Sequence, residues 1–133
     1  MTFQDITHLV EAAAPSKLVI TGEDRFLGYS LMCGARAALI GMAAACTRIQ
    51  AELLRAYWDG DPSRFLELSA AVDDLAQHTF IAPMEGYILR MLWCLVFQGV
   101  IPEDAAHDPW GPALGDGEYD RLAACLRRLE DVE

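Results

Sequence analysis

The chain has 133 residues, hydrophobic residues make up 53% of it, and 20 Asp and Glu against 10 Lys and Arg give a net charge of −10 at pH 7 with neutral histidines. The resulting negative field repels a phosphate backbone, so the composition argues against nucleic acid as a partner. The length predicts a single domain over residues 1–133, and the high apolar content predicts that some apolar surface meets a partner.

Nothing in the sequence favours a membrane. The longest uninterrupted apolar stretch, residues 37–46, is far shorter than the roughly 20 residues that cross a bilayer. The only lysine is Lys17, and no cluster of basic residues lies beside an apolar helical face. Because no basic region precedes an apolar one at the N-terminus, we expect a cytoplasmic protein with no membrane partner.

The cysteines and histidines do not predict a metal centre. Four cysteines are spread along the chain without a C-x-x-C pair, and they are predicted to be reduced, buried thiols. The three histidines are isolated from one another and from other ligand types in sequence. We therefore expect neither a metal nor a cofactor.

The first third of the chain alternates between helical and strand patterns. Residues 2–14 predict an amphipathic helix, with Thr2 as a possible cap. Residues 18–21 are mostly β-branched and predict a strand buried on both faces. Residues 26–33 predict a helix that ends at Gly34, and residues 37–41 predict a second strand. This order, with short connections, is typical of parallel α/β architecture.

The rest of the chain has a helical pattern. Asp61 and Pro62 suit the cap and first turn of a helix. A loop rich in Pro and Gly covers residues 101–117. The predicted helices run over residues 47–58, 62 to about 80, 84–98 and 118–129.

Several side chains within these helices have both a structural and a functional interpretation. Arg90 suits a structural partner better than a bound carboxylate. Tyr29 and Tyr87 are possible proton-transfer groups, but helical spacing favours core positions with satisfied hydroxyls. The tryptophans are expected to fill space, and acidic and basic pairs are expected on solvated faces; these residues are Trp58, Trp93, Trp110, Asp73, Asp74, Arg127 and Arg128.

The run Thr21-Gly22-Glu23-Asp24, followed by Gly34-Ala35 and the strand through Leu39, resembles the dihydrodipicolinate synthase and N-acetylneuraminate lyase family. The resemblance implies a helix-dominated α/β fold. Residues 1–46 would be a partial barrel segment with the last two parallel strands of a (β/α)8 TIM barrel. Residues 47–133 would be the C-terminal helical extension, which Gly99-Val100-Ile101 and the loop 109–112 resemble.

The same resemblance implies a lyase or aldolase whose catalytic groups lie outside this chain. The family forms a Schiff base between a lysine on the sixth strand and a 2-keto acid such as pyruvate, and it uses a tyrosine on the fourth strand. The first helix here corresponds to the one after the lysine strand. Lys17 precedes its strand, whereas barrel chemistry occurs at the carboxyl ends of strands. We expect no catalytic residue and a chain that is inactive alone.

The resemblance also implies that this chain forms one wall of the substrate pocket. The residues of this wall are Gly22, Asp24, Leu39, Ile40 and Gly41. Asp24 can accept hydrogen bonds from substrate hydroxyls, and Gly22 allows close backbone approach. The alternative is that the acidic turn starts a helix at its positive dipole end and that Gly41 ends a strand.

Two strands cannot close a barrel, so the inward side of residues 18–41 would expose apolar surface. We therefore expect a homo-oligomer or a complex with the N-terminal half of a barrel, which would bind the 2-keto acid only when complete. An incomplete gene model predicts the same structure. The alternative from another class is a non-catalytic helical interaction or regulatory module, with residues 47–129 as its body and no need for a second half.

Overall fold

The computed structural model describes residues 2–132, which form mostly α-helices and a single pair of short strands. The connections contain one-turn 3-10 helices at Gly41–Ala44, Met84–Gly86 and Glu103–Ala105. In chain order the main elements are α1 (Phe3–Ala13), β1 (Ile20–Thr21), α2 (Leu27–Met32), β2 (Ala37–Ala38), α3 (Thr47–Asp59), α4 (Pro62–Thr79), α5 (Tyr87–Phe97) and α6 (Glu118–Glu130). The helix-dominated α/β class predicted from the sequence is confirmed.

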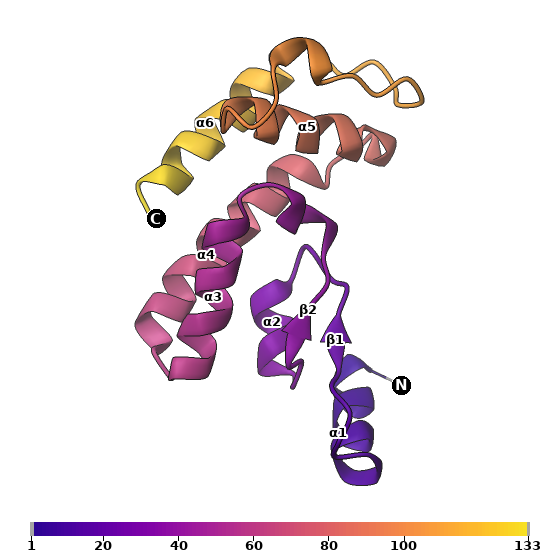
Figure 1. Cartoon of the computed structure of the whole chain (residues 1–133), viewed down its shortest axis with the longest axis vertical. Helices are drawn as coiled ribbons and strands as arrows, with labels where there is room; N and C mark the ends of the chain where they lie inside the picture. The colour runs from indigo at the N-terminus through magenta and orange to yellow at the C-terminus, as the bar shows by residue number, and fades with distance from the viewer. Residues whose placement is uncertain (1, 133) are drawn as a thin grey trace.

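β1 and β2 are parallel and lie side by side, with α2 as the connection between them (Figure 1). Ile20 is opposite Ala37, and Thr21 is opposite Ala38. Hydrogen bonds from Arg36 N to Val19 O and from Leu39 N to Thr21 O extend the pairing at both ends. The predicted parallel pair is therefore confirmed, although each strand is shorter than expected.

One face of this two-stranded sheet is open. Side chains alternate along a strand, so Leu18 and Ile20 share a face, and the register places Leu39 on the same face. These three side chains, which we call the open sheet face, are 66%, 54% and 81% exposed. Thr21, on the opposite face, is buried. The prediction of a first strand buried on both faces is wrong within this chain, because no element of residues 2–132 covers the side of Ile20.

The hydrophobic core lies mainly among α3, α4, α5 and α6, with α2 packed against α3 and α4. In Figure 1, α3 and α4 lie side by side, and α5 and α6 form a second pair at the end of the molecule remote from α1. Fully buried members include Ile49, Leu53, Leu68, Leu75 and Leu122. Burying each such side chain stabilises the fold by about 1.5–3 kcal/mol.

Local signals set the helix ends. Gly60 adopts a left-handed conformation with φ 71°, which glycine tolerates and which ends α3. The Asp61 side chain accepts a hydrogen bond from Arg64 N, and Pro62 occupies the first turn of α4. At the start of α1, Thr2 and Asp5 form a reciprocal capping box. The predicted caps at Thr2, Asp61 and Pro62 are confirmed.

α1 is attached to the rest of the molecule through a buried hydroxyl. Thr7 donates a hydrogen bond to the main-chain oxygen of Cys33, at the end of α2. Gly34 follows with φ 103°, and a Cβ there would lie 3.0 Å from Thr7 Oγ1. The glycine is therefore required both by its conformation and by the close approach of α1.

Some predicted core residues lie on the surface instead. Tyr29 is 62% exposed, because α2 packs through Leu27 and Leu31 and turns Tyr29 outward. Trp110 is 93% exposed on the loop that follows α5, and Trp58 is also exposed, so both predictions of space-filling tryptophans are wrong. The four cysteines are free and buried, as predicted.

No single helix of residues 2–132 has the length and apolar character needed to cross a bilayer. The segments Pro62–Thr79 and Met84–Phe97 reach that length and composition only together, and the chain bends by 113° between them.

A surface charge cluster on α3 and α4 makes one part of the stability depend on pH. Glu52 accepts hydrogen bonds at 3.0 Å from Arg48 Nε and at 3.0 Å from Arg64 Nη2. These bonds, first that of Arg48 and then that of Arg64, hold the pKa of Glu52 below its ordinary value of 4.5. A carboxyl whose pKa is lowered by folding stabilises the fold above its ordinary pKa, and this contribution disappears as the pH falls through the lowered pKa.

We therefore expect Glu52→Gln to lower the free energy of unfolding at pH 7, by an amount that shrinks to nothing in acid. Urea unfolding at a series of pH values measures this difference. Glu103→Gln, at an exposed position, is the control and should change little at any pH. A Glu52→Gln difference that stays constant with pH would contradict the charge assignment.

Candidate functional site

The residues predicted to line a substrate pocket meet at one edge of the sheet. Gly22 and Asp24 follow β1, and Leu39, Ile40 and Gly41 follow β2. Because the strands are parallel, both segments leave the sheet at its carboxyl edge, where α/β proteins bind ligands. A Cβ on Gly22 would lie 3.8 Å from the main-chain oxygen of Leu39. The structure thus brings together the two segments that the sequence singled out.

Asp24 joins the two segments directly. Its Oδ1 accepts a hydrogen bond of 2.6 Å from Met42 N, the residue after Gly41. Its other carboxylate oxygen makes no hydrogen bond to the rest of residues 2–132, and the residue is only half-buried. One oxygen therefore fixes the loop, while the other is available to a hydroxyl donor.

The predicted wall residues do not share one environment. Gly22, Leu39 and Gly41 are exposed, and Leu39 belongs to the open sheet face. Ile40 is half-buried and packs against the hydrophobic core. Its backbone lies at the carboxyl edge, but its side chain helps to hold the edge in place.

Tyr87, expected in the core with a satisfied hydroxyl, instead adds a phenol to this edge. Its Oη would lie 2.8 Å from a Cβ on Gly41, so α5 carries the hydroxyl to the end of β2. The ring stacks on Phe80 with centroids 4.5 Å apart. The hydroxyl is buried and has no hydrogen-bond partner in residues 2–132. Its expected satisfaction by a core partner is therefore wrong.

The electrostatics at this edge keep the Tyr87 phenol protonated. Burial, and then the negative charge of Asp24, raise the pKa of Tyr87 above its ordinary value of 10.0. Both effects disfavour the phenolate. The edge therefore contains one buried, unpaired O–H donor and one half-buried carboxylate acceptor, on two different segments.

We expect Asp24→Ala to lower the free energy of unfolding by about 2 kcal/mol, because the buried Met42 N–H loses a charged acceptor. Glu23→Ala is the matched control. Glu23 accepts only a local bond from Arg25 N, and its removal should change stability by less than about 0.5 kcal/mol. Urea unfolding measures both variants, and equal effects would contradict a specific role of the Asp24–Met42 bond.

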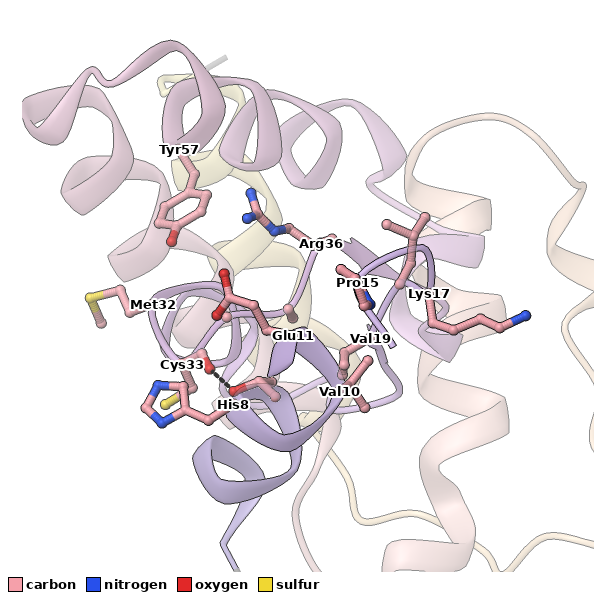
Figure 2. A pocket seen from close by; sticks show the side chains of 14 residues that line it. His8, Val10, Glu11, Pro15, Lys17, Val19, Met32, Cys33, Arg36 and Tyr57 are labelled. Carbon is pink, nitrogen blue, oxygen red and sulfur yellow. Dashed lines mark hydrogen bonds between the residues drawn. The ribbon is translucent and has the colours of Figure 1, made fainter. Parts of the chain in front are cut away.

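A cavity lies at the opposite, amino ends of the strands (Figure 2). It has a volume of about 540 Å³ and is bounded by α1 and by the segments before β1 and β2. The polar side chains around it are those of Thr7, His8, Glu11, Lys17, Arg36 and Tyr57. The Lys17 amine points away from the side chains of His8, Glu11 and Arg36 in Figure 2. Lys17 also lies three residues before β1. It is thus at the amino end of the strand, whereas barrel chemistry occurs at the carboxyl ends.

Arg90 has a structural environment. It is fully buried, and its Nε donates to Glu118 Oε1. Its Nη1 donates to the main-chain oxygens of Ile81 at 2.9 Å and Pro83 at 3.0 Å. The structural interpretation of Arg90 fits these contacts better than a role in binding a free carboxylate.

Side chains that are able to hold a metal lie away from the sheet. Asp74 and His78 of α4 and Cys125 of α6 have ligand atoms that all lie within 4.8 Å of one another. No metal site was expected, because the cysteines form no C-x-x-C pair and the histidines are isolated in sequence. The spacing of Asp74 and His78 by one helical turn was the only local signal for this group.

Comparison with known proteins adds no relative to this description. The chain matches no protein-family model and no curated protein. The likeness to the dihydrodipicolinate synthase family therefore depends on the motif residues, their order and the parallel strand pair.

Proposed function

We propose that this chain is the C-terminal part of a Schiff-base, pyruvate-dependent aldolase or lyase of the dihydrodipicolinate synthase family. It supplies one wall of the substrate pocket and the helical extension, and it is inactive until a partner completes the barrel with the reactive lysine. The partner that supplies the lysine is the N-terminal half of a barrel; association of a second copy would cover the open sheet face but would supply no such lysine. The complex acts in the cytoplasm on a 2-keto acid.

The parallel β1–α2–β2 unit is the observation that carries this proposal. A (β/α)8 barrel is built by repetition of this unit, and its ligands bind at the carboxyl edge. Asp24 and Gly41, which the motif places at the ends of successive strands, meet at that edge through the bond from Met42 N. The arrangement of these residues at one edge of the sheet therefore supports the proposal.

The open sheet face supports an incomplete barrel. In a closed barrel one side of each strand faces the outer helices and the other side fills the interior. Here Thr21 is buried on one face, while Leu18, Ile20 and Leu39 are exposed on the other. Further strands placed against these side chains would cover them, as the interior of a barrel requires.

The chemistry divides between the two parts. The partner's lysine amine attacks the keto carbon of the substrate, the C=N bond forms and water leaves. This chain binds the substrate, because the free carboxylate oxygen of Asp24 accepts a hydrogen bond from a substrate hydroxyl. Leu39 provides an apolar surface for the methyl group of the keto acid.

Trapping with borohydride tests the proposal. The purified chain is incubated with pyruvate and borohydride, alone and with a separately produced lysine-bearing N-terminal half of a complete family enzyme, and intact masses are measured. We expect no adduct on this chain in either mixture and an adduct on the partner half that increases when this chain is added. An adduct on this chain that disappears in Lys17→Arg would overturn the division of roles.

The second candidate is a non-catalytic helical interaction or regulatory module. The observation in its favour is that the core among α3, α4, α5 and α6 is continuous without the strands. This function predicts a stable monomer at all concentrations, whereas the barrel proposal predicts self-association or binding of the N-terminal half. Sedimentation velocity over a hundredfold range of concentration separates the two.

A further inference from the structure

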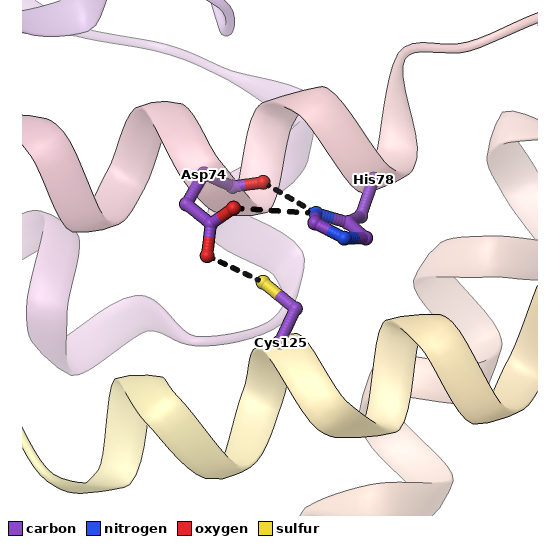
Figure 3. A group of neighbouring side chains, drawn as sticks. All are labelled: Asp74, His78 and Cys125. Atoms are coloured by element: carbon purple, nitrogen blue, oxygen red, sulfur yellow. Dashed lines mark hydrogen bonds and ion pairs between the residues drawn. The ribbon is translucent and has the colours of Figure 1, made fainter.

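A group of three unlike side chains lies where α4 packs against α6, independent of the sheet (Figure 3). Asp74 and His78 are one turn apart on α4, and Cys125 comes from the facing side of α6. The Asp74 carboxylate lies between the other two: Oδ1 is 3.6 Å from His78 Nδ1, and Oδ2 is 3.5 Å from Cys125 Sγ. All three ligand atoms fit within 4.8 Å.

These separations suit a small tetrahedral ion. Zinc bonds of about 2.0–2.1 Å to nitrogen, 2.0–2.2 Å to oxygen and 2.3 Å to sulfur place neighbouring ligand atoms about 3.3–3.7 Å apart. The Asp74–His78 and Asp74–Cys125 separations have such values, each through a different carboxylate oxygen. Rotation of these side chains is therefore needed to bring one oxygen, the nitrogen and the sulfur, which lie within 4.8 Å of one another, around a single ion. A donor set of one imidazole, one carboxylate and one thiolate favours Zn²⁺ over Mg²⁺ or Ca²⁺, which prefer oxygen alone.

The environment is dry on one side and open on the other. Cys125 is fully buried in the core, while Asp74 and His78 are half-buried. An ion can therefore enter past the histidine and the carboxylate. Burial of the sulfur on the inner side limits competition from water.

Without a metal, the same side chains form hydrogen bonds with one another and with their surroundings. The Cys125 thiol donates to Asp74 Oδ2, Arg128 Nη2 donates to the same oxygen at 2.7 Å, and His78 Nδ1 lies 2.8 Å from the main-chain oxygen of Asp74. Arg128 is exposed and can turn into solvent. The half of the carboxylate that faces His78 is not held by Arg128. A metal bound at Nδ1 therefore displaces the thiol proton and the imidazole contact, and the Nδ1 proton that makes this contact moves to Nε2 through solvent.

We propose that Asp74, His78 and Cys125 form a Zn²⁺ site with three protein ligands and a fourth position open to water or an added ligand. On binding, the Cys125 S–H bond breaks, the S–Zn bond forms and the proton passes to solvent. Three protein ligands with an open position are typical of reactive rather than structural zinc. The site does not depend on completion of the barrel.

Titration of the full chain with Co²⁺ tests the site, because a thiolate–cobalt charge-transfer band and intense visible bands report sulfur ligation and tetrahedral geometry. We expect one equivalent of Co²⁺ to bind and Zn²⁺ to displace it. Cys125→Ser should abolish the charge-transfer band, and His78→Gln should weaken binding by about tenfold or more, since even outer-shell changes cost that much. Circular dichroism checks that each variant is folded.

Matched controls separate this site from adventitious binding. Asp73→Asn, His107→Gln and Cys33→Ser remove the same chemical groups elsewhere and should leave Co²⁺ affinity unchanged. Arg128→Gln removes a positive charge beside Asp74 and should tighten binding severalfold, unlike Arg127→Gln. The assignment is overturned if no stoichiometric binding occurs, or if folded Cys125→Ser and His78→Gln bind as the parent does.

Discussion

Replacing Glu118 with glutamine is expected to lower the free energy of unfolding by about 3 kcal/mol, because breaking a buried ion pair leaves its partner charge uncompensated. Arg90 is fully buried, and Glu118 is its only carboxylate partner in residues 2–132. The guanidinium also binds the main-chain oxygens of the segment between α4 and α5. This pair therefore ties α6 to the bend that precedes α5.

Urea unfolding at pH 7 measures this effect, and Glu130→Gln, at an exposed position of the same helix, is the control. The double variant Arg90→Met with Glu118→Leu should recover part of the loss relative to Glu118→Gln, since an apolar pair removes the unpaired charge. A change below about 1 kcal/mol in folded Glu118→Gln, the size of an exposed pair, would show that water screens the interaction.

The second large effect concerns the open sheet face. We expect Leu39→Asp to weaken binding of a lysine-bearing N-terminal half by about tenfold or more, since burying one leucine contributes about 1.5–3 kcal/mol. Self-association of the chain should fall in parallel. Stability of the isolated chain should change by less than about 0.5 kcal/mol, because an 81% exposed side chain contributes little to its core.

Leu66→Asp is the matched control, since Leu66 is 64% exposed on α4. Sedimentation velocity and titration calorimetry measure association of both variants. If the parent chain is monomeric at every concentration and does not bind the N-terminal half, the barrel proposal fails and the helical module is favoured. Equal loss of binding in both variants would assign the association to general apolar surface.

The helical part of the fold could be predicted because its signals are local. Asp61 and Pro62 start α4 through contacts within one turn, and Gly60 ends α3 through its own φ angle. Such features depend on a few neighbouring residues. The helix ends therefore agreed with the sequence to within a residue or two, except at Met84–Gly86, where the predicted helix begins as a 3-10 turn.

The strands were less predictable, because the length of a strand depends on which residues pair with a neighbouring strand. β-Branched residues 18–21 predicted a strand of four residues, but only Ile20 and Thr21 have a ladder partner on β2. No element of residues 2–132 covers the face of the sheet on which Ile20 lies. The pattern of apolar residues in a sequence does not show whether an apolar face of a strand is covered within the same chain.

The candidate site was predictable to the same extent. Asp24 and Gly41 follow successive parallel strands, so their proximity followed from topology alone. Tyr87 and Cys125 come from helices whose rotation is set by core packing, and no spacing in the sequence indicates which of their side chains reach a given place. The phenol beside Gly41 and the thiol beside Asp74 required the structure.

The approach of Tyr87 to Gly41 connects the start of α5 to the carboxyl edge of the sheet. A methyl group at residue 41 would push on the phenol and hence on α5, so Gly41→Ala should disturb the two places together. By the same route, a movement of the start of α5 would be transmitted to the carboxyl edge of the sheet.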